Sequence, residues 1–381
     1  MVANMSAPER VSFDIPEDVT YLNCAYLSPL LNSVVAAGRD AVGRKANPWK
    51  ILHRDFFDEV EALRAAFAVL IEAEPNDIAV VPSTAYGIAT AAANIPLAPG
   101  DTIVIPATEH ASTYHKWRVT AAENGAQLRA IEIADDGDWT DAIIARIDKR
   151  TRVVSVPHVH WSDGRSFDLE RIGSAAHAAG AAFIVDGTQS IGAVPLSVRN
   201  LRPDYLTCSA YKWLLCPYGF AFLYVAPKHQ GGRPFEEHYF HRANAARHEG
   251  RLEQLLEYDR GARRFDMGER ANFITTPMSI VALNQLAAWS VTGIQARIVP
   301  VSEAIIAGAE ALGYVAHPRA RRMPHLFGLR RRGGLPARLG EVLTEAKVFV
   351  SIRGDAIRVS PHVYNDEADV ERLLSALRSA G

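Results

Sequence analysis

The sequence predicts an α/β fold in which a mainly parallel, doubly wound sheet of seven strands is followed by a smaller C-terminal α+β domain. Two observations lead to this fold class. Seven short runs rich in β-branched residues alternate with alanine-rich segments of helical periodicity. Most of these runs are apolar throughout, as parallel strands are when helices cover both faces of a sheet.

The predicted strands follow one another at the spacing that crossover helices require. They span residues 77–83, 101–107, 127–133, 152–159, 181–187, 204–210 and 219–225. The clearest helix between them covers residues 168–180, with Asp168 as its N-cap and Gly180 as its stop signal. Farther along, residues 276–313 have the periodicity of one or two helices, and residues 366–380 form the last predicted helix.

The domain organisation follows from length and from a change of pattern. A chain of 381 residues is long for one hydrophobic core, so we expect more than one domain. We expect an N-terminal arm over residues 1–18, a large α/β domain over residues 19–260 and a small α+β domain over residues 261–381.

Composition excludes several classes of function. The net charge of -2 gives no field that would gather nucleic acid or an anionic membrane. No apolar run approaches the ~20 residues of a membrane span, and no segment resembles a signal peptide. The three cysteines have no metal-like spacing, and no metal site is predicted. We expect a cytoplasmic protein with reduced thiols.

Polar residues follow the predicted strands at the edge where open α/β sheets bind ligands. Asp186 ends one buried strand, where an unpaired carboxylate would be costly, and therefore needs a cationic partner. Lys212 follows a later strand, with Ser209 and Tyr211 beside it. A lone lysine in this position usually extends its ammonium group to water, but this lysine does not stand alone.

Two further strand ends complete the pattern. Ser83, Thr84 and Ala85 lie where a strand turns into a helix, and the free N–H groups of such a helix start suit a phosphate. His110 follows another strand, where its flat ring could cover a planar ligand. An acid, a lysine, a phosphate-binding helix start and a ring fit a site for pyridoxal phosphate, which acts on amino acids.

Two motifs carry a family resemblance. "VDGTQSIGAVPL", followed by "SAYKWLLCPYGFAFLYV", resembles the class V aminotransferase family of fold-type I pyridoxal phosphate enzymes, which includes cysteine desulfurases, isopenicillin N epimerase-like proteins and kynureninases. The similarity extends from "YLNCAYLSPL" to "IRVSPHVYNDEADV". The resemblance implies a homodimer with shared active sites.

The resemblance also implies roles for individual residues. Lys212 would form the Schiff base and carry the proton at the α-carbon, Asp186 would pair with the pyridine nitrogen, and Arg358 would bind the substrate's α-carboxylate. The remaining cofactor contacts would come from Gln189 at the ring oxygen, His110 stacked on the ring, and Ser83, Thr84, Ala85, Ser209 and Tyr211 around the phosphate. Asn272 would reach the neighbouring subunit's phosphate or merely cap a helix.

Departures from the family pattern narrow the activity. Desulfurases usually carry a histidine where this chain has Tyr211, and Trp161 replaces a family asparagine. Desulfurases also need a cysteine nucleophile shortly before the last arginine segment, and "AKVFVSIRGDAIRVS" contains none. A desulfurase is therefore not expected. The substrate pocket would be lined by Tyr26, Trp161, Tyr114 and His241.

Several activities remain open. We expect an aminotransferase first, a lyase that cleaves a C–S bond by β-elimination second, and an isopenicillin N epimerase-like racemase third. The cofactor residues do not separate these activities, because all three begin with removal of the same α-proton. A nucleotide-binding α/β protein without pyridoxal phosphate is the alternative from another class. The dinucleotide-binding version would need a G-x-G-x-x-G turn after an early strand, and none is present.

Overall fold

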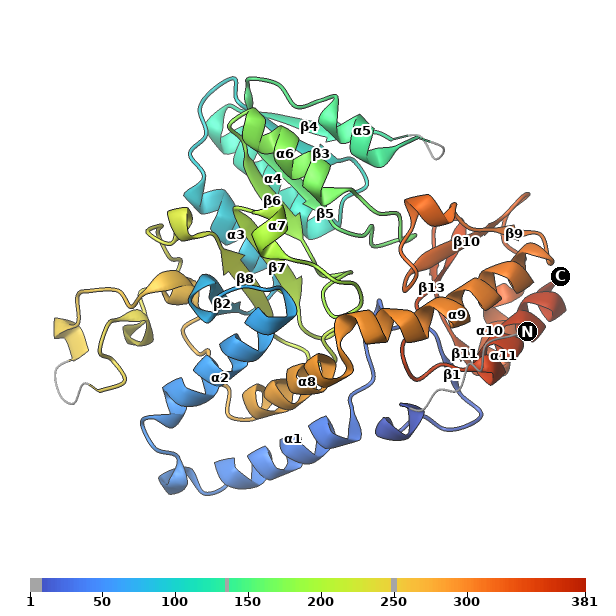
Figure 1. Cartoon of the computed structure of the whole chain (residues 1–381), viewed down its shortest axis with the longest axis horizontal. Helices are drawn as coiled ribbons and strands as arrows, with labels where there is room; N and C mark the ends of the chain where they lie inside the picture. Colours follow the sequence, from blue (N-terminus) through green and yellow to red (C-terminus); the bar gives the residue numbers. More distant parts are fainter. Residues whose placement is uncertain (1–8, 134–136, 248–251) are drawn as a thin grey trace.

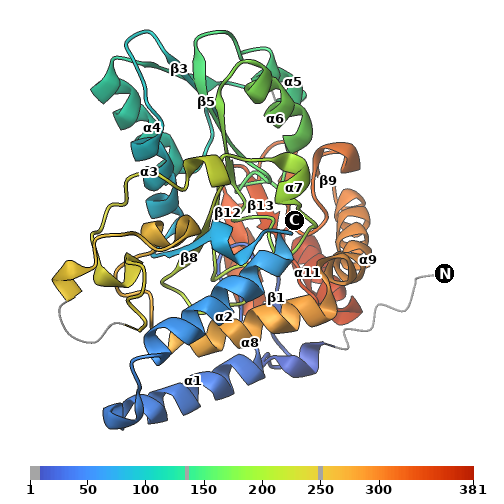
Figure 2. The ribbon, with the colours of Figure 1, turned by 60° about the vertical axis from the view of Figure 1, so that its left-hand side comes forward.

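A computed structural model describes residues 9–133, 137–247 and 252–381, and its arrangement is shown in Figures 1 and 2. A seven-stranded sheet lies at the centre, in the order β2-β8-β7-β6-β5-β3-β4. Its strands are β2 (Ile78–Val81), β3 (Thr102–Pro106), β4 (Gln127–Ile131), β5 (Thr151–Pro157), β6 (Ala182–Asp186), β7 (Tyr205–Ser209) and β8 (Ala221–Val225). Each predicted strand is confirmed to within two residues at either end.

Strand β8 makes the sheet mixed rather than wholly parallel. It pairs antiparallel with both β7 and β2, whereas β4, β3, β5, β6 and β7 pair parallel with one another. Because β7 and β8 are antiparallel, the chain turns back between them without a crossover helix. Lys212 lies in this short connecting segment.

Helices cover both faces of the sheet, as its apolar strands predict. One face packs against α3 (Thr84–Asn94) and α4 (Ala111–Asn124). The other packs against α2 (Asp55–Leu70), α5 (Trp139–Ile144), α6 (Leu169–Ala178) and α8 (Thr275–Trp289). Neighbouring strand residues such as Val153 and Val154 belong to opposite faces, which explains why the strands are apolar throughout.

Two further α-helices of the large domain are α1 (Asn32–Lys45) and α7 (Val198–Leu201). Helix α6 begins as predicted, because Asp168 accepts a hydrogen bond from the Arg171 N–H at 3.0 Å. Helices α1, α2 and α8 run side by side below the sheet (Figure 2). Short 3₁₀ helices span Arg10–Ser12, Pro48–Lys50, Pro75–Asp77, Pro227–His229, Tyr239–His241, Leu252–Gln254, Gly261–Phe265 and Arg319–Arg321.

The small domain lies to one side of the large one and has its own sheet (Figure 1). This sheet has the order β12-β13-β10-β9, and α9, α10 and α11 pack with it around a second core. The elements are α9 (Val291–Glu310), β9 (Tyr314–Val315), β10 (Phe327–Arg331), α10 (Leu339–Glu345), β12 (Ser351–Arg353), β13 (Ala356–Val359) and α11 (Glu367–Ala380). A separate parallel pair joins β1 (Thr20–Tyr21) to β11 (Val348–Phe349).

The two hydrophobic cores divide the chain elsewhere than at the expected boundary of residue 260. Leu283, Ile294 and Ile298 pack into the large-domain core, whereas the small-domain core includes Val301 and, from the N-terminal side, Leu22. We therefore propose that the small domain begins within α9. The expected arm falls partly on residues 1–8, outside the described residues, while Phe13 is buried in the large-domain core.

Candidate active site

The parallel strands bring their carboxyl ends to one edge of the sheet, and the predicted site residues meet there. β6 ends at Asp186, β7 ends at Ser209, and α3 begins at Thr84 directly after β2. His110 precedes α4, after β3. The strand pairing therefore assembles in space residues that are far apart in the sequence.

Three adjoining hollows occupy this edge, with volumes of about 550, 60 and 250 Å³. All three are lined by His110 and Tyr211. Together they collect all but three of the predicted site residues: Tyr26, Ser83, Thr84, Ala85, His110, Trp161, Asp186, Gln189, Ser209, Tyr211, Lys212 and Arg358.

Lys212 lines both the hollow of about 550 Å³, called here the outer hollow, and the hollow of about 60 Å³, called the inner hollow. The chain after β7 is held by a hydrogen bond from the Leu215 N–H to the Lys212 carbonyl oxygen at 3.1 Å. Burial lowers the pKa of Lys212 to about 8, although the charge of Asp186 acts in the opposite direction. The amine is therefore more easily deprotonated than an exposed lysine, which suits a nucleophile and proton carrier.

Asp186 and Gln189 are fixed by the turn after β6. An Asp186 carboxylate oxygen accepts a hydrogen bond from the Thr188 N–H at 2.8 Å. The Gln189 amide donates to the Ala25 carbonyl oxygen at 3.1 Å, and its oxygen accepts from the Trp213 indole N–H at 2.9 Å. One amide N–H of Gln189 is used by Ala25, which leaves its second N–H for a ligand.

Hydroxyl groups gather at the start of α3. Ser83 is its N-cap, and its side chain accepts from the Tyr86 N–H at 3.1 Å. The Thr84 hydroxyl lies 2.7 Å from the Ser209 hydroxyl and 3.0 Å from the Thr188 hydroxyl. Hydroxyl donors and the positive end of a helix dipole make this hollow suitable for a phosphate group.

His110 and Trp161 line the cavity together. Their rings are nearly perpendicular, with centroids 6.0 Å apart. Burial lowers the pKa of His110, which favours the neutral ring. The Trp161 indole N–H donates to the Thr108 carbonyl oxygen at 3.0 Å, and this bond fixes the ring at the cavity wall.

Sequence reasoning missed Glu109, which lines the inner hollow with Asp186. It is 6% exposed, and its Oε1 accepts a hydrogen bond from the His110 N–H at 2.6 Å. Its Oε2 is buried with no hydrogen-bond partner in the described part of the chain. Burial, then the charge of Asp186, raises the pKa of Glu109 to about 8. Its place beside His110 at a strand end was the available signal.

Arg358 lies in the outer hollow with a second arginine that sequence reasoning also missed, Arg353. The Arg358 guanidinium donates to the Trp161 carbonyl oxygen at 2.8 Å and to the Ser351 hydroxyl at 3.3 Å. The signal for Arg353 was its place in "SIRGDAIRVS", where a tight turn separates two arginines.

Three expected residues lie outside the hollows. Asn272 is exposed, and its side-chain oxygen accepts hydrogen bonds from the Ile274 and Thr275 N–H groups at 3.0 and 2.9 Å, so it caps the start of α8. Tyr114 belongs to α4 and packs against the core between that helix and the sheet, and His241 is buried with its Nδ1 3.2 Å from the Glu236 carbonyl oxygen.

The cysteines are also outside the site. Cys24, Cys208 and Cys216 are buried, and none lines the three hollows. Burial raises the pKa of the Cys24 and Cys216 thiols well above their usual value, which suppresses the reactive thiolate. Within the described residues, no group of three or more histidine, cysteine or acidic side chains could hold a metal ion.

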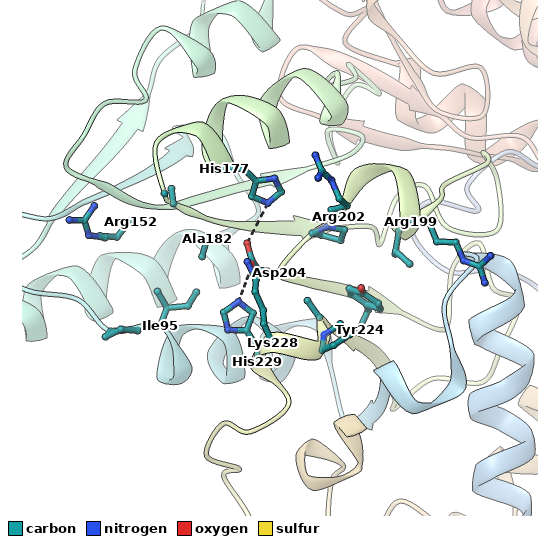
Figure 3. Close-up of a pocket in the computed structure, with 17 residues that line it drawn as sticks. Ile95, Arg152, His177, Ala182, Arg199, Arg202, Asp204, Tyr224, Lys228 and His229 are labelled. Carbon is teal, nitrogen blue, oxygen red and sulfur yellow. Dashed lines mark hydrogen bonds and ion pairs between the residues drawn. The ribbon is translucent and has the colours of Figure 1, made fainter. Parts of the chain in front are cut away.

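Another cavity, of about 800 Å³, lies at the opposite edge of the sheet (Figure 3). Asp204, directly before β7, is held there by the His229 ring at 2.7 Å and the Lys228 ammonium at 2.5 Å. Arg152 and Arg199 point away from each other at its two sides (Figure 3). Its central carboxylate is already paired, and no predicted site residue lines it. We therefore assign the active site to the carboxyl edge.

The residues of the carboxyl edge fit pyridoxal phosphate. Glu109 Oε2 and Arg358 Nε are buried there without hydrogen-bond partners in the described structure, so polar groups are available to a ligand. The donor set also matches, with an amine for the aldehyde, a carboxylate for the pyridine nitrogen, and hydroxyls and a helix start for the phosphate.

Comparison with known proteins gives a family match and several relatives. The profile of the family described as Aminotransferase class-V matches residues 21–254. The "Uncharacterized aminotransferase YcbU" of Bacillus subtilis is 26% identical over 340 residues, covering 89% of this chain and 87% of the relative. The isopenicillin N epimerase of Amycolatopsis lactamdurans is 27% identical and covers 99% of each chain.

Solved structures show the same fold. A variant of the C-S lyase C-DES, with glycine covalently linked to its PLP cofactor, has a TM-score of 0.89 at 21% identity and covers 98% of this chain and 100% of that one. The apo cysteine desulfurase of Thermococcus onnurineus NA1 has a TM-score of 0.84 at 22% identity, with 99% and 98% covered. Both likenesses describe the fold and leave the reaction open.

Proposed function

The chain belongs to the aminotransferase class-V family, and from this premise we propose that it acts at the α-carbon of an amino acid as an aminotransferase. As a member of that family it is a pyridoxal phosphate enzyme. The observation that carries the proposal is the meeting of Lys212, Asp186 and a helix start suited to a phosphate in adjoining hollows.

We propose that this set of residues holds the cofactor. Lys212 would bind its aldehyde carbon, Asp186 its pyridine nitrogen and Gln189 its ring oxygen, while His110 would cover the ring. Ser83, Thr84, Ala85, Ser209 and Tyr211 line the hollow that would take the phosphate. When bound, pyridoxal phosphate withdraws electrons from the substrate's α-carbon and so makes its proton removable.

Lys212 and Arg358 would act on the substrate itself. Arg358 would bind the α-carboxylate through a planar guanidinium, which the Trp161 carbonyl oxygen orients at 2.8 Å. Lys212 Nζ would move the proton at the α-carbon, and its pKa of about 8 leaves part of the amine unprotonated near neutral pH. Tyr26 and Trp161 would form the wall of the substrate pocket.

Elimination and epimerisation are the second candidates. The cavity contains no cysteine thiol, which disfavours a desulfurase but leaves a C–S lyase possible, since β-elimination needs no thiol from the protein. The similarity to an isopenicillin N epimerase over nearly the whole chain supports epimerisation. The similarity to the "Uncharacterized aminotransferase YcbU" over 89% of this chain supports transamination.

One experiment separates these activities. Single L-amino acids are added to the holoenzyme without a keto acid, and the visible absorbance of the lysine-bound cofactor is followed with the products. We expect the band to disappear with one equivalent of keto acid, as transamination requires. Pyruvate released over many turnovers would instead identify a lyase. Loss of optical activity with an unchanged band would identify an epimerase.

We also propose that the enzyme is a cytoplasmic homodimer. Tyr26, Leu27 and Tyr218 line the outer hollow and are 57%, 42% and 72% exposed. Large apolar side chains around the opening of a site suit a protein partner that would cover them. The exposed Asn272 would then be free to approach the partner's cavity. None of the helices in the described residues is long and apolar enough to span a membrane.

A further inference from the structure

The hairpin of β12 and β13 carries two arginines into the same hollow. In its antiparallel register Ser351 lies opposite Arg358, and Arg353 lies opposite Ala356. Opposite residues share a face, as do residues two apart in a strand, so Arg353 and Arg358 are diagonal neighbours on one face. Both line the outer hollow of about 550 Å³, beside Lys212.

The two arginines differ in how they are held. Arg358 is fixed by the Trp161 carbonyl oxygen and the Ser351 hydroxyl. The Arg353 side chain forms no hydrogen bond or ion pair with any residue in the described ranges, and its Nε is buried without a partner. Its guanidinium is therefore a set of donors near Lys212 that the protein itself leaves unsatisfied.

In the described structure, the two arginines have no acidic side chain beside them in the lining of the outer hollow, which also includes Lys212. Asp186, whose charge acts on Lys212, lines the inner hollow. Burial, followed by the charge of Arg353, lowers the pKa of Arg358 to about 10, which reflects the proximity of two like charges. Partly buried cations without an anion are unfavourable unless a ligand supplies one.

A simple amino acid supplies a single negative charge, the α-carboxylate, and the proposed function assigns that charge to Arg358. We propose that the substrate carries a second acidic group on its side chain and that Arg353 binds it. This inference rests on the proposed function and adds the substrate class: amino acids whose side chain ends in a carboxylate, sulfinate or sulfonate. Each of these offers oxygen acceptors to a guanidinium fork.

The test compares amino acids of equal size and different charge on the holoenzyme. L-Aspartate is paired with L-asparagine, L-glutamate with L-glutamine, and L-cysteine sulfinate with L-cysteine. Apparent dissociation constants come from the change in visible absorbance. We expect at least one acid to bind about 10-fold or more tightly than its neutral partner, because a charge-assisted bond is gained. The pair with the largest ratio distinguishes a carboxylate from a sulfur acid.

Two variants connect the preference to Arg353. Arg353→Met should reduce the ratio between acid and neutral partner to about 3-fold or less, with little change for the neutral partner, and Arg353→Lys should restore part of it. Arg338→Met is the matched control, because Arg338 is exposed on the distant small-domain surface before α10, and the ratio should not change.

Three results would overturn the inference. The first is that neutral amino acids bind with the same apparent dissociation constants as the acidic ones. The second is that the ratio between acid and neutral partner is unchanged in Arg353→Met. Both leave the proposed function intact, because an amino acid still binds. The third is an absorbance that no amino acid changes, which would also refute the proposed function.

Discussion

Glu109 shows how one buried carboxyl group links the site to the stability of the protein. Its pKa is raised from 4.5 to about 8, so between these values the folded protein keeps a proton that the unfolded chain releases. The folded state binds more protons over that range. The free energy of unfolding therefore falls as the pH rises from 4.5 to about 8, and it stays lower above pH 8.

We expect Glu109→Gln to remove this pH dependence, because the amide cannot ionise. In urea unfolding of the apoprotein, the free energy of unfolding of the variant should rise relative to that of the wild type between pH 5 and 8, by up to about 1.4 kcal/mol for each pH unit. Glu123→Gln, an exposed change in helix α4, which begins two residues after Glu109, should give no gain in the free energy of unfolding. Parallel stability curves for wild type and Glu109→Gln would contradict this account.

At the scale of elements, helix α3 is placed by its close approach to β7. A Cβ atom added at Gly87 would lie 2.5 Å from the Thr207 hydroxyl oxygen, so only glycine fits there. Gly87 is one turn from Thr84, whose hydroxyl contacts that of Ser209 at the end of β7. The glycine therefore sets the distance between the two elements that form the phosphate hollow.

We expect Gly87→Ala to push α3 away from β7. The clash should destabilise the protein by about 1–3 kcal/mol and weaken cofactor binding, measured by thermal unfolding and by titration with pyridoxal phosphate. The double variant with Thr207→Ala should recover much of both losses, since it removes the contacted hydroxyl. Gly43→Ala in α1 meets no atom within 4 Å and serves as the control. Equal behaviour of Gly87→Ala and Gly43→Ala would refute this role.

The elements also show what the sequence could and could not predict. The strands were predictable because β-branched runs buried on both faces have few other uses, and Asp186, Lys212 and Arg358 were found through strand ends and family motifs. Arg353 was missed because its place depends on the register of a hairpin. The proposed boundary within α9 differs from the one expected after residue 260, because helical periodicity does not reveal which core a helix will meet.

At the scale of the whole molecule, the small domain completes a site that the large domain begins. β13 supplies Arg358, and its guanidinium is oriented by the Trp161 carbonyl oxygen of the large domain. Close by, the buried Asp163 accepts hydrogen bonds from Arg165 at 2.9 Å and from Arg330 of β10 at 3.2 Å. This charged contact joins the two domains, so the proposed α-carboxylate site depends on their fixed arrangement.

The central claim is that Lys212 binds pyridoxal phosphate covalently. The most direct measurement is reduction of the holoenzyme with borohydride, followed by mass spectrometry of its peptides. We predict one reduced cofactor on the peptide that contains Lys212, and no labelled peptide from a folded Lys212→Ala variant. A cofactor found on another lysine, or a Lys212→Ala variant that still yields a labelled peptide, would contradict the account.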